Sequence, residues 1–360
     1  MSSNTYATSG VDTEKEDLAM SLIRPLFKKT FQFNHDLITN IELDDHYAAV
    51  VKVSDEVGIA IKTDGVGTKT FVAQYMDKYD TVGIDCIAMN VNDIICVGAK
   101  PTTFIDYLAL QNSDPELIHE IAKGLKIGAD MAKVSIVGGE TAIMPEMITG
   151  VRDGKGFDLA GCALGIVNPD EVIDGKRIEE GDSLIGISSS GIHSNGMTLA
   201  RKVLDLEKNF DRYYNELDRT LGEELLEPTS IYVNEILDLI SAKISLKVVA
   251  HITSDGLLNL RRIGNNFGYR ITSLPKPQPI YKIIQNAHKT DISEMYKVYN
   301  MGIGMCVVVP KKQEDMSVDI VEKHGKKAFR LGEARFDQDR RIILEELDLI
   351  SEGDKFIKRY

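Results

Sequence analysis

Residues 57–70, VGIAIKTDGVGTKT, are the stretch that decides the fold. They begin as a mostly apolar segment that predicts a β-strand, and this strand runs into a glycine turn at 64–67. In residues 81–97 apolar side chains recur every three or four positions, which predicts an amphipathic α-helix with Asp85 and Asn92 together on its other side. A strand, a turn and a helix in this order indicate a fold of packed helix and sheet layers.

The same alternation continues along the first half of the chain. We expect strands at 102–110, 134–140 and 158–167, and a helix at 115–131. Residues 168–182, NPDEVIDGKRIEEGD, are rich in turn residues and charges. This composition predicts a linker.

The second half repeats the strand and helix alternation without repeating the residues. A strand begins at 183, a helix is predicted at 195–206, and Pro228 sits where the first turn of another helix is expected. At about 150 residues per domain, the chain length fits two domains. We predict an N-terminal domain at 1–168 and a C-terminal domain at 169–360, both of the α+β or α/β class.

Composition excludes several kinds of partner. Lys and Arg total 42 against 55 Asp and Glu, a net charge of -13, so we expect neither nucleic acid nor a membrane as a partner. The polar N-terminus is unlike a signal peptide, and no apolar run approaches the roughly 20 residues of a membrane span. Because Cys86, Cys96, Cys162 and Cys306 form no CxxC pair, we expect free thiols and a cytoplasmic location.

The turn after the first strand is the sharpest local feature. Gly65 and Gly67 bring backbone N–H groups close to a ligand, Lys69 supplies a positive charge, and Asp64 is able to hold a metal. Thr68 separates the second glycine from the lysine, so the segment is not a Walker A loop, and the third glycine of a dinucleotide fingerprint is missing. The alternative is an ordinary glycine turn capped by its aspartate.

Three carboxylates each lie at the end of an apolar element. They are Asp64, Asp93 and Glu140, the last within the segment Val137–Thr141, VGGET. Mg²⁺ bound to a nucleotide prefers one or two carboxylates together with phosphate oxygens, so such a trio suits it. Taken singly, each acid is more often a helix cap or a solvated residue.

The segment 188–196, SSSGIHSNG, lies between a predicted strand and a predicted helix. Hydroxyl groups and backbone N–H groups at this position favour an anion, such as the phosphate of a substrate, and His193 is a candidate for proton exchange near neutral pH. The alternative is a loop in which Ser194 or Asn195 caps the helix and the histidine is merely exposed. His251, at the end of another predicted strand, is a weaker candidate.

At these residues the chain resembles the phosphoribosylformylglycinamidine cyclo-ligase family, in the same order and over nearly the full length. The matching segments are TDGVGTK (63–69), GIDCIAMNVNDI (83–94), GAKPTTFIDYLAL (98–110), GGETAIMPEM (138–147), DLAGCALGIV (158–167), SSGIHSNG (189–196), EPTSIYV (227–233), AHIT (250–253) and YNMGIGM (299–305). Tyr6 and residues 10–12 also fit the opening of the family.

The resemblance implies a fold and a reaction. It implies an N-terminal α/β domain whose strands build a barrel across a homodimer, followed by a C-terminal domain of layered helices and sheet. It also implies ATP with Mg²⁺, and the conversion of formylglycinamidine ribonucleotide to aminoimidazole ribonucleotide, ADP and phosphate in purine biosynthesis. Phosphorylation makes the formyl oxygen a leaving group, and a nitrogen then closes the ring.

The resemblance also assigns roles to the candidate residues. Lys69, Asp93 and His193 are the predicted catalytic residues. The nucleotide and its phosphates are assigned to Asp64, Gly65, Gly67, Thr68, Lys69, Gly138, Gly139, Glu140 and Thr141, the substrate to Ser189, Ser190, Gly191, His193, Ser194 and Asn195, and the metal to Asp64, Asp93 and Glu140.

Two alternatives stay open at this stage. The first is another ATP-using enzyme of the same fold, such as selenophosphate synthetase, although the first cysteine of this chain is only Cys86. The second is a nucleotide-binding module without catalysis. Departures from the family pattern motivate it, because Ser254-Asp255-Gly256 replaces three glycines and Ile143 replaces a common acid.

Overall fold

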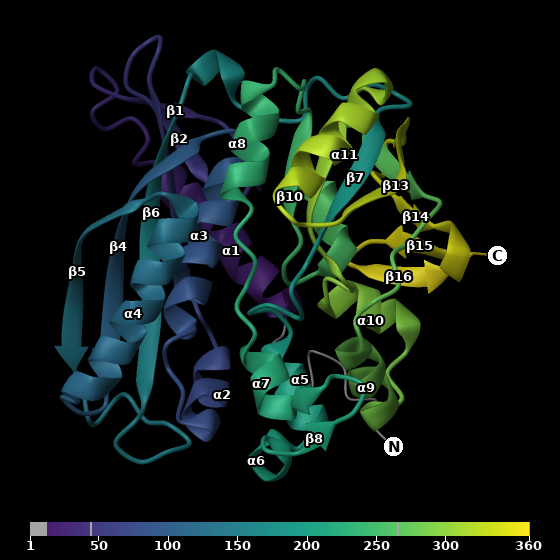
Figure 1. Cartoon of the computed structure of the whole chain (residues 1–360). Coiled ribbons are helices and arrows are strands. Elements are labelled where there is room, and N and C mark those ends of the chain that lie inside the picture. Colours follow the sequence, from purple (N-terminus) through teal and green to yellow (C-terminus); the bar gives the residue numbers. More distant parts are fainter. Residues whose placement is uncertain (1–12, 44, 265, 360) are drawn as a thin grey trace.

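The computed structural model describes residues 13–43, 45–264 and 266–359, which form two large sheets side by side (Figure 1). The first half of the chain builds a six-stranded sheet, and the second half builds an eight-stranded sheet. The mixture of helices and strands predicted for both halves is confirmed. Tyr6 and residues 10–12 lie outside the described residues. Within the described ranges, no helix is long and apolar enough to cross a bilayer.

The first half consists of a sheet with helices packed on it. Its helices are α1 (Thr13–Lys28), α2 (Lys69–Met76), α3 (Val82–Cys96) and α4 (Pro115–Ala132), and its strands are β1 (Thr39–Ile41), β2 (Ala49–Lys52), β3 (Gly58–Gly65), β4 (Lys100–Leu110), β5 (Ser135–Ile143) and β6 (Phe157–Val167). The strands lie in the order β1-β2-β3-β6-β4-β5. Neighbours are antiparallel except for the parallel pair of β4 and β5.

The pleat gives this sheet two different faces. Along β6 the odd-numbered residues are buried, and the even-numbered residues are partly or largely exposed. Residues paired across strands point to the same face, so the buried face includes Asp64, which pairs with Gly161. Helices α3 and α4 cover the buried face (Figure 1).

Helix α3 is buried on all sides, whereas the sequence predicted an amphipathic helix. Every residue from Val82 to Cys96 is buried, including Asp85, Asn92 and Asp93. The apolar side packs against the sheet and α4. The polar side is also covered, because it faces segments from the second half of the chain.

The second half is a larger sheet with helices and short 3₁₀ turns. Its helices are α5 (Met197–Val203), α6 (Leu206–Asn209), α7 (Leu221–Leu226), α8 (Val233–Ser241), α9 (Pro279–His288), α10 (Ile292–Val298) and α11 (Glu314–Lys323), with 3₁₀ turns η2 (Pro169–Glu171), η3 (Gly256–Arg262), η4 (Lys311–Gln313) and η5 (Glu345–Leu347). Its strands are β7 (Ser183–Ser188), β8 (Tyr213–Tyr214), β9 (Arg219–Thr220), β10 (Val248–His251), β11 (Phe267–Ile271), β12 (Ile303–Val309), β13 (Ala328–Phe336), β14 (Ile342–Leu344), β15 (Leu349–Glu352) and β16 (Lys355–Lys358). The large sheet has the order β10-β12-β7-β13-β11-β14-β15-β16, and β8 pairs with β9 in a separate ribbon.

Two predicted helices of this half differ from the structure. The helix expected at 195–206 is divided into α5 and α6, because Asp205 has a left-handed backbone conformation with φ of 45°. Pro228 does not start a helix, and α8 begins only at Val233. The residues between them are instead hydrogen-bonded to α3, where Asp85 accepts from the backbone N–H of Thr229 and Asn92 donates to the carbonyl of Ser230.

Candidate active site between the two halves

Helix α3 carries the polar side chains that join the two halves. Asn92 Nδ2 donates to the carbonyl of Ser230 at 2.9 Å, and Asn92 Oδ1 accepts from the backbone N–H of Tyr232 at 3.0 Å. Both contacts bring the loop before α8 onto the helix. The site described below is therefore built from both halves of the chain.

One polar cluster joins β3, α3 and β10. Lys62 Nζ lies 2.8 Å from Asp93 Oδ2 and 3.3 Å from Asp64 Oδ2. His251 Nδ1 lies 2.8 Å from Asp93 Oδ1, and its Nε2 faces the amide nitrogen of Asn92 at 3.4 Å. Because an amide nitrogen can only donate, His251 Nε2 accepts and its Nδ1–H donates to the aspartate. The imidazole ring is fully buried.

The charges of this cluster compensate one another. Burial raises the pKa of Asp93, but the hydrogen bond from His251 and the charge of Lys62 outweigh it, so the pKa of Asp93 is lowered. The pKa of Asp64 is raised, mainly by burial, while the Lys62 charge opposes this shift. Burial lowers the pKa of Lys62, but the carboxylates of Asp93 and Asp64 raise it further than burial lowers it. The lysine is therefore an ammonium cation held between two carboxylates.

A second cluster surrounds Asp85 on the same helix. Its Oδ1 accepts from Lys69 Nζ at 2.9 Å, and from both the backbone N–H and the hydroxyl group of Thr229 at 2.8 and 2.6 Å. Ser194 Oγ donates to the same oxygen at 3.2 Å. Lys69 also donates to the carbonyl of Glu227 at 2.5 Å, and the lysine and aspartate side chains are both fully buried. In this arrangement Lys69 joins the halves, and its predicted contact with phosphate stays a prediction.

The glycine turn connects β3, which carries Lys62 and Asp64, to α2, which begins at Lys69. Gly65 N donates to Asp64 Oδ1 at 2.8 Å, so the aspartate caps its own turn. Gly67 is exposed and has a φ of 68°. Apart from its chain neighbours, no heavy atom of the described residues lies within 4 Å of the position a Cβ would take. Thr68 precedes the first residue of α2, and its hydroxyl group lies 2.9 Å from that of Thr198. The turn therefore leaves space beside a helix N-terminus, as expected of a phosphate site.

The loop at 188–196 is hydrogen-bonded to residues that lie later in the second half of the chain. Gly191 O accepts from Tyr281 and Asn300, Ser189 Oγ donates to Asn300, and Asn195 Oδ1 accepts from Ser254. The contacts are 2.9 to 3.1 Å long. They fix the backbone of the loop.

His193 in this loop is buried, contrary to the alternative of an exposed histidine. Its exposed fraction is 1% and its φ is 61°. Nε2 accepts from the backbone N–H groups of Ser190 and Ser230 at 3.2 and 3.4 Å, which places the ring proton on Nδ1. Nδ1 is buried without a partner among the described residues. Burial holds the pKa of His193 well below its usual range, so the ring is neutral.

Within one chain Glu140 lies far from Asp64 and Asp93, the other two predicted metal ligands. It pairs with Tyr107 and, through it, with Ala160, which places it on the exposed face of the sheet, while Asp64 lies on the buried face. Strand β5 is three strands away from β3, a separation of about 14 Å at the usual strand spacing. No group of three His, Cys, Asp or Glu side chains in the described ranges is arranged to hold a metal ion. The reason is the pleat, which sends Glu140 to the opposite face.

The other residues of this segment share the edge strand. Gly138, Gly139 and Thr141 lie on β5, where they pair with Ile105, Asp106 and Leu108 of β4. All of these β5 residues are exposed. Their predicted nucleotide contacts stay a prediction.

The sequence interpretation missed Lys62, Asp85 and Thr229 as parts of the site. Lys62 stands two positions before Asp64 in a strand, so the pleat puts both side chains on one face. The two-residue spacing therefore predicts that Lys62 lies beside Asp64. Thr229 lies 144 residues beyond its partner Asp85, and no local pattern reports such a contact.

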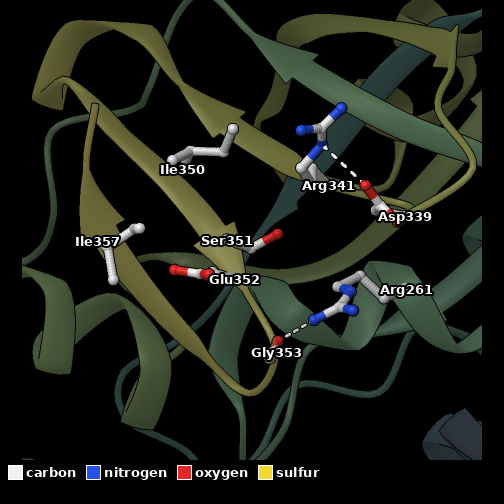
Figure 2. Close-up of a pocket in the computed structure, with 8 residues that line it drawn as sticks. All are labelled: Arg261, Asp339, Arg341, Ile350, Ser351, Glu352, Gly353 and Ile357. Carbon is white, nitrogen blue, oxygen red and sulfur yellow. Dashed lines mark hydrogen bonds and ion pairs between the residues drawn. The ribbon is translucent and has the colours of Figure 1, made fainter. Parts of the chain in front are cut away.

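One cavity lies away from both polar clusters. It has a volume of about 530 Å³ and shares no residue with the predicted site (Figure 2). Its lining consists of Arg261, Asp339, Arg341, Ile350, Ser351, Glu352, Gly353 and Ile357. Arg261 donates to the carbonyl of Gly353, and Arg341 pairs with Asp337 and Asp339, so both guanidinium groups are already engaged. We assign this cavity no part in the reaction.

Comparison with known sequences gives the family. Residues 45–167 match the family described as AIR synthase related protein, N-terminal domain, and residues 179–345 match its C-terminal domain. The phosphoribosylformylglycinamidine cyclo-ligase of Methanothermobacter thermautotrophicus is 45% identical over 95% of this chain and 97% of its own length. That of Thermococcus kodakarensis is 46% identical over 91% of this chain and 94% of its own.

Solved structures share the fold at low identity. A chain of the HypE–HypF complex superimposes with a TM-score of 0.61 at 19% identity, covering 89% of this chain and 95% of that one. PurL of T. maritima complexed with ADP gives a TM-score of 0.56 at 18% identity, covering 87% of this chain and 46% of that one. These similarities show the fold alone.

The two-sheet fold and the polar site between its halves define a two-domain α/β enzyme of the AIR synthase related class. The chain belongs to the phosphoribosylformylglycinamidine cyclo-ligase family, and it is a ligase. The family predicted from the sequence is confirmed.

Proposed function

We propose that this chain closes the ring of formylglycinamidine ribonucleotide, using ATP, to give aminoimidazole ribonucleotide, ADP and phosphate. The observation that carries the proposal is the 45% identity to a cyclo-ligase over 95% of the chain. ATP use also agrees with the PurL neighbour of the same fold, which is complexed with ADP. The four free thiols favour a cytoplasmic location. The family matches at 45–167 and 179–345 favour two domains divided near residue 168.

The residues of the first cluster fit a nucleotide-bound Mg²⁺. Asp64 and Asp93 converge on one cation, Lys62, so they already form a point of negative charge on the buried face of the sheet. Two carboxylates completed by phosphate oxygens are a usual Mg²⁺ environment. The metal would neutralise charge on the transferred phosphoryl group when bound there with ATP. Glu140 is left out of this proposed metal site, because within one chain it lies on the opposite face of the sheet from Asp64.

The loop at 188–196 is proposed to bind the phosphorylated substrate. His193 is neutral, with its Nε2 lone pair occupied by backbone donors, so it is unsuited to act as a base in this state. Its Nδ1–H is a buried donor without a partner in the described part of the chain, which a substrate oxygen would satisfy. Ser194 links this loop to Asp85 and so couples substrate position to the first half of the chain.

We also propose a homodimer formed through the exposed face of the N-terminal sheet. Apolar side chains on this face remain 39–43% exposed, namely Ile61, Ile105, Tyr107 and Ile166. An apolar sheet face with an open edge strand is normally covered by another chain. Ile105→Lys is expected to convert a dimer to monomers in light scattering at micromolar concentration. A wild-type protein that scatters only as a 39.9 kDa species would contradict the dimer.

A direct assay tests the function. Purified protein is incubated with ATP, Mg²⁺ and formylglycinamidine ribonucleotide, and both ADP and the aminoimidazole product are measured. We expect both products in equal amounts. ATP bound without turnover would instead favour a nucleotide-binding module without catalysis.

A further inference from the structure

The cation between Asp64 and Asp93 comes from the chain itself. Lys62 Nζ contacts one oxygen of each carboxylate, at 3.3 and 2.8 Å. The remaining Asp93 oxygen is engaged by His251, and the remaining Asp64 oxygen accepts from Gly65 N. The lysine therefore completes the hydrogen bonding of both acids.

A metal ion and this ammonium group are incompatible at the same point. Mg²⁺ bonds to oxygen at about 2.0–2.1 Å, so an ion shared by the two carboxylates would lie where Lys62 Nζ now lies. Two positive charges a few ångströms apart in a partly buried site repel each other strongly. One of the two cations has to leave before the other binds.

Lys62 has a route away from the carboxylates. Its side chain is 23% exposed and that of Asp64 is 34% exposed, compared with 6% for Asp93, so the cluster is open to solvent beside Lys62 and Asp64. A lysine carries its charge on a flexible four-carbon chain, and it binds phosphate as a point charge. The phosphates of a nucleotide would provide both the oxygens that complete the metal site and a new partner for the lysine.

We propose that Lys62 is an internal cation that takes the place of a divalent metal between Asp64 and Asp93 in the nucleotide-free protein, and that it leaves these carboxylates when Mg²⁺ arrives with the nucleotide. The role of Lys62 rests on the proposed function in one respect, because it requires that the nucleotide binds beside Asp64 and Asp93. The consequence is a site that accepts Mg²⁺ together with phosphates and excludes the free ion.

Manganese binding without nucleotide tests the proposal. Mn²⁺ is titrated into the purified full-length protein and the free ion is followed by electron paramagnetic resonance. In Lys62→Met we expect one site per chain that binds Mn²⁺ at least about tenfold more tightly than wild type, because removing one partner of a buried pair leaves charge for another cation to neutralise. Asp93→Asn in the Lys62→Met background should remove that site.

Control variants separate this effect from a general change of charge. Lys100→Met removes an equal charge from an exposed position on β4 and should leave Mn²⁺ binding as in wild type. Lys62→Arg keeps the cation and should still exclude the metal. Circular dichroism verifies folding, and Lys62→Gln provides a second neutral side chain if the methionine variant is unstable.

Equal Mn²⁺ affinity in wild type and in the neutral Lys62 variants would overturn the proposal, whether that affinity is high or undetectable. The titration involves no turnover. A failure of the cyclisation assay would therefore refute the proposed function without affecting the Mn²⁺ result. An enzyme that forms the product but shows no difference in Mn²⁺ affinity between wild type and the Lys62 variants would refute only the role of Lys62.

Discussion

Asp85 is the residue on which the junction of the two halves most depends. A single carboxylate oxygen accepts from Lys69, Thr229 and Ser194, and the lysine and aspartate side chains are both fully buried. Removing one partner of such a pair leaves an uncompensated buried charge. Asp85→Asn is therefore expected to lower the free energy of unfolding by about 3–5 kcal/mol, measured by denaturant titration.

A surface pair provides the matched control. Asp130 pairs with Lys126 across one helical turn, with side chains 57% and 75% exposed. Asp130→Asn should cost less than about 1 kcal/mol, because solvent screens such pairs. Similar losses in the two variants would show that Asp85 and Lys69 do not act as a buried pair.

At the scale of elements, α3 and α4 approach so closely that glycine is required between them. A Cβ on Gly83 would lie 2.1 Å from the backbone nitrogen of Leu125 and 2.5 Å from the carbonyl carbon of Gly124. Backbone cannot move aside as a flexible side chain would, so the helices would have to separate. Gly83→Ala is expected to destabilise the protein by about 1–3 kcal/mol despite the better helix propensity of alanine.

Thermal unfolding measures this effect. Lys123→Ala, at an exposed position of α4, is the control and should change the midpoint little. A Gly83→Ala protein as stable as wild type would mean that the two helices tolerate a wider spacing.

The same helix shows what the sequence could and could not predict. Apolar periodicity at 81–97 located α3 to within one residue at each end, because that pattern is local. The burial of its polar side could not be predicted, because the partners Thr229 and His251 lie 144 and 158 residues further along the chain. The position of Glu140 could not be predicted either, because its separation from Asp64 depends on the strand order and the pleat of the sheet.

At the scale of the whole molecule, His46 joins the start of the first sheet to the segment between the halves. Its Nε2–H donates to the carbonyl of Ile173 at 2.9 Å, and its Nδ1 accepts from the backbone N–H of Tyr47 at 2.9 Å. Burial, and to a smaller extent the charge of Arg262, lower the pKa of His46 to about 4, although Ile173 and the charges of Asp93 and Asp174 oppose the shift. The ring is neutral in the folded protein.

This shift predicts a loss of stability in acid. Below the ordinary histidine value the unfolded chain takes up a proton that the folded chain does not, so the stability present above about pH 6.5 is lost as the pH falls toward 4. We expect His46 to account for a decrease of about 2 kcal/mol between about pH 7 and about pH 4.5. Denaturant titrations of wild type and His46→Gln at both pH values measure it. Equal pH dependence in the two proteins would contradict the assignment.

The central claim is that both halves build one site for ATP-dependent ring closure, with Asp93 at its centre. The most direct measurement follows ADP and aminoimidazole ribonucleotide in the same reaction, for wild type and for Asp93→Asn, over a range of Mg²⁺ concentrations. We predict equal amounts of the two products in wild type, and a rate about 10²–10³-fold lower in Asp93→Asn that partly recovers as Mg²⁺ is raised. ADP formed without the aminoimidazole product, or an Asp93→Asn enzyme as fast as wild type, would contradict the account.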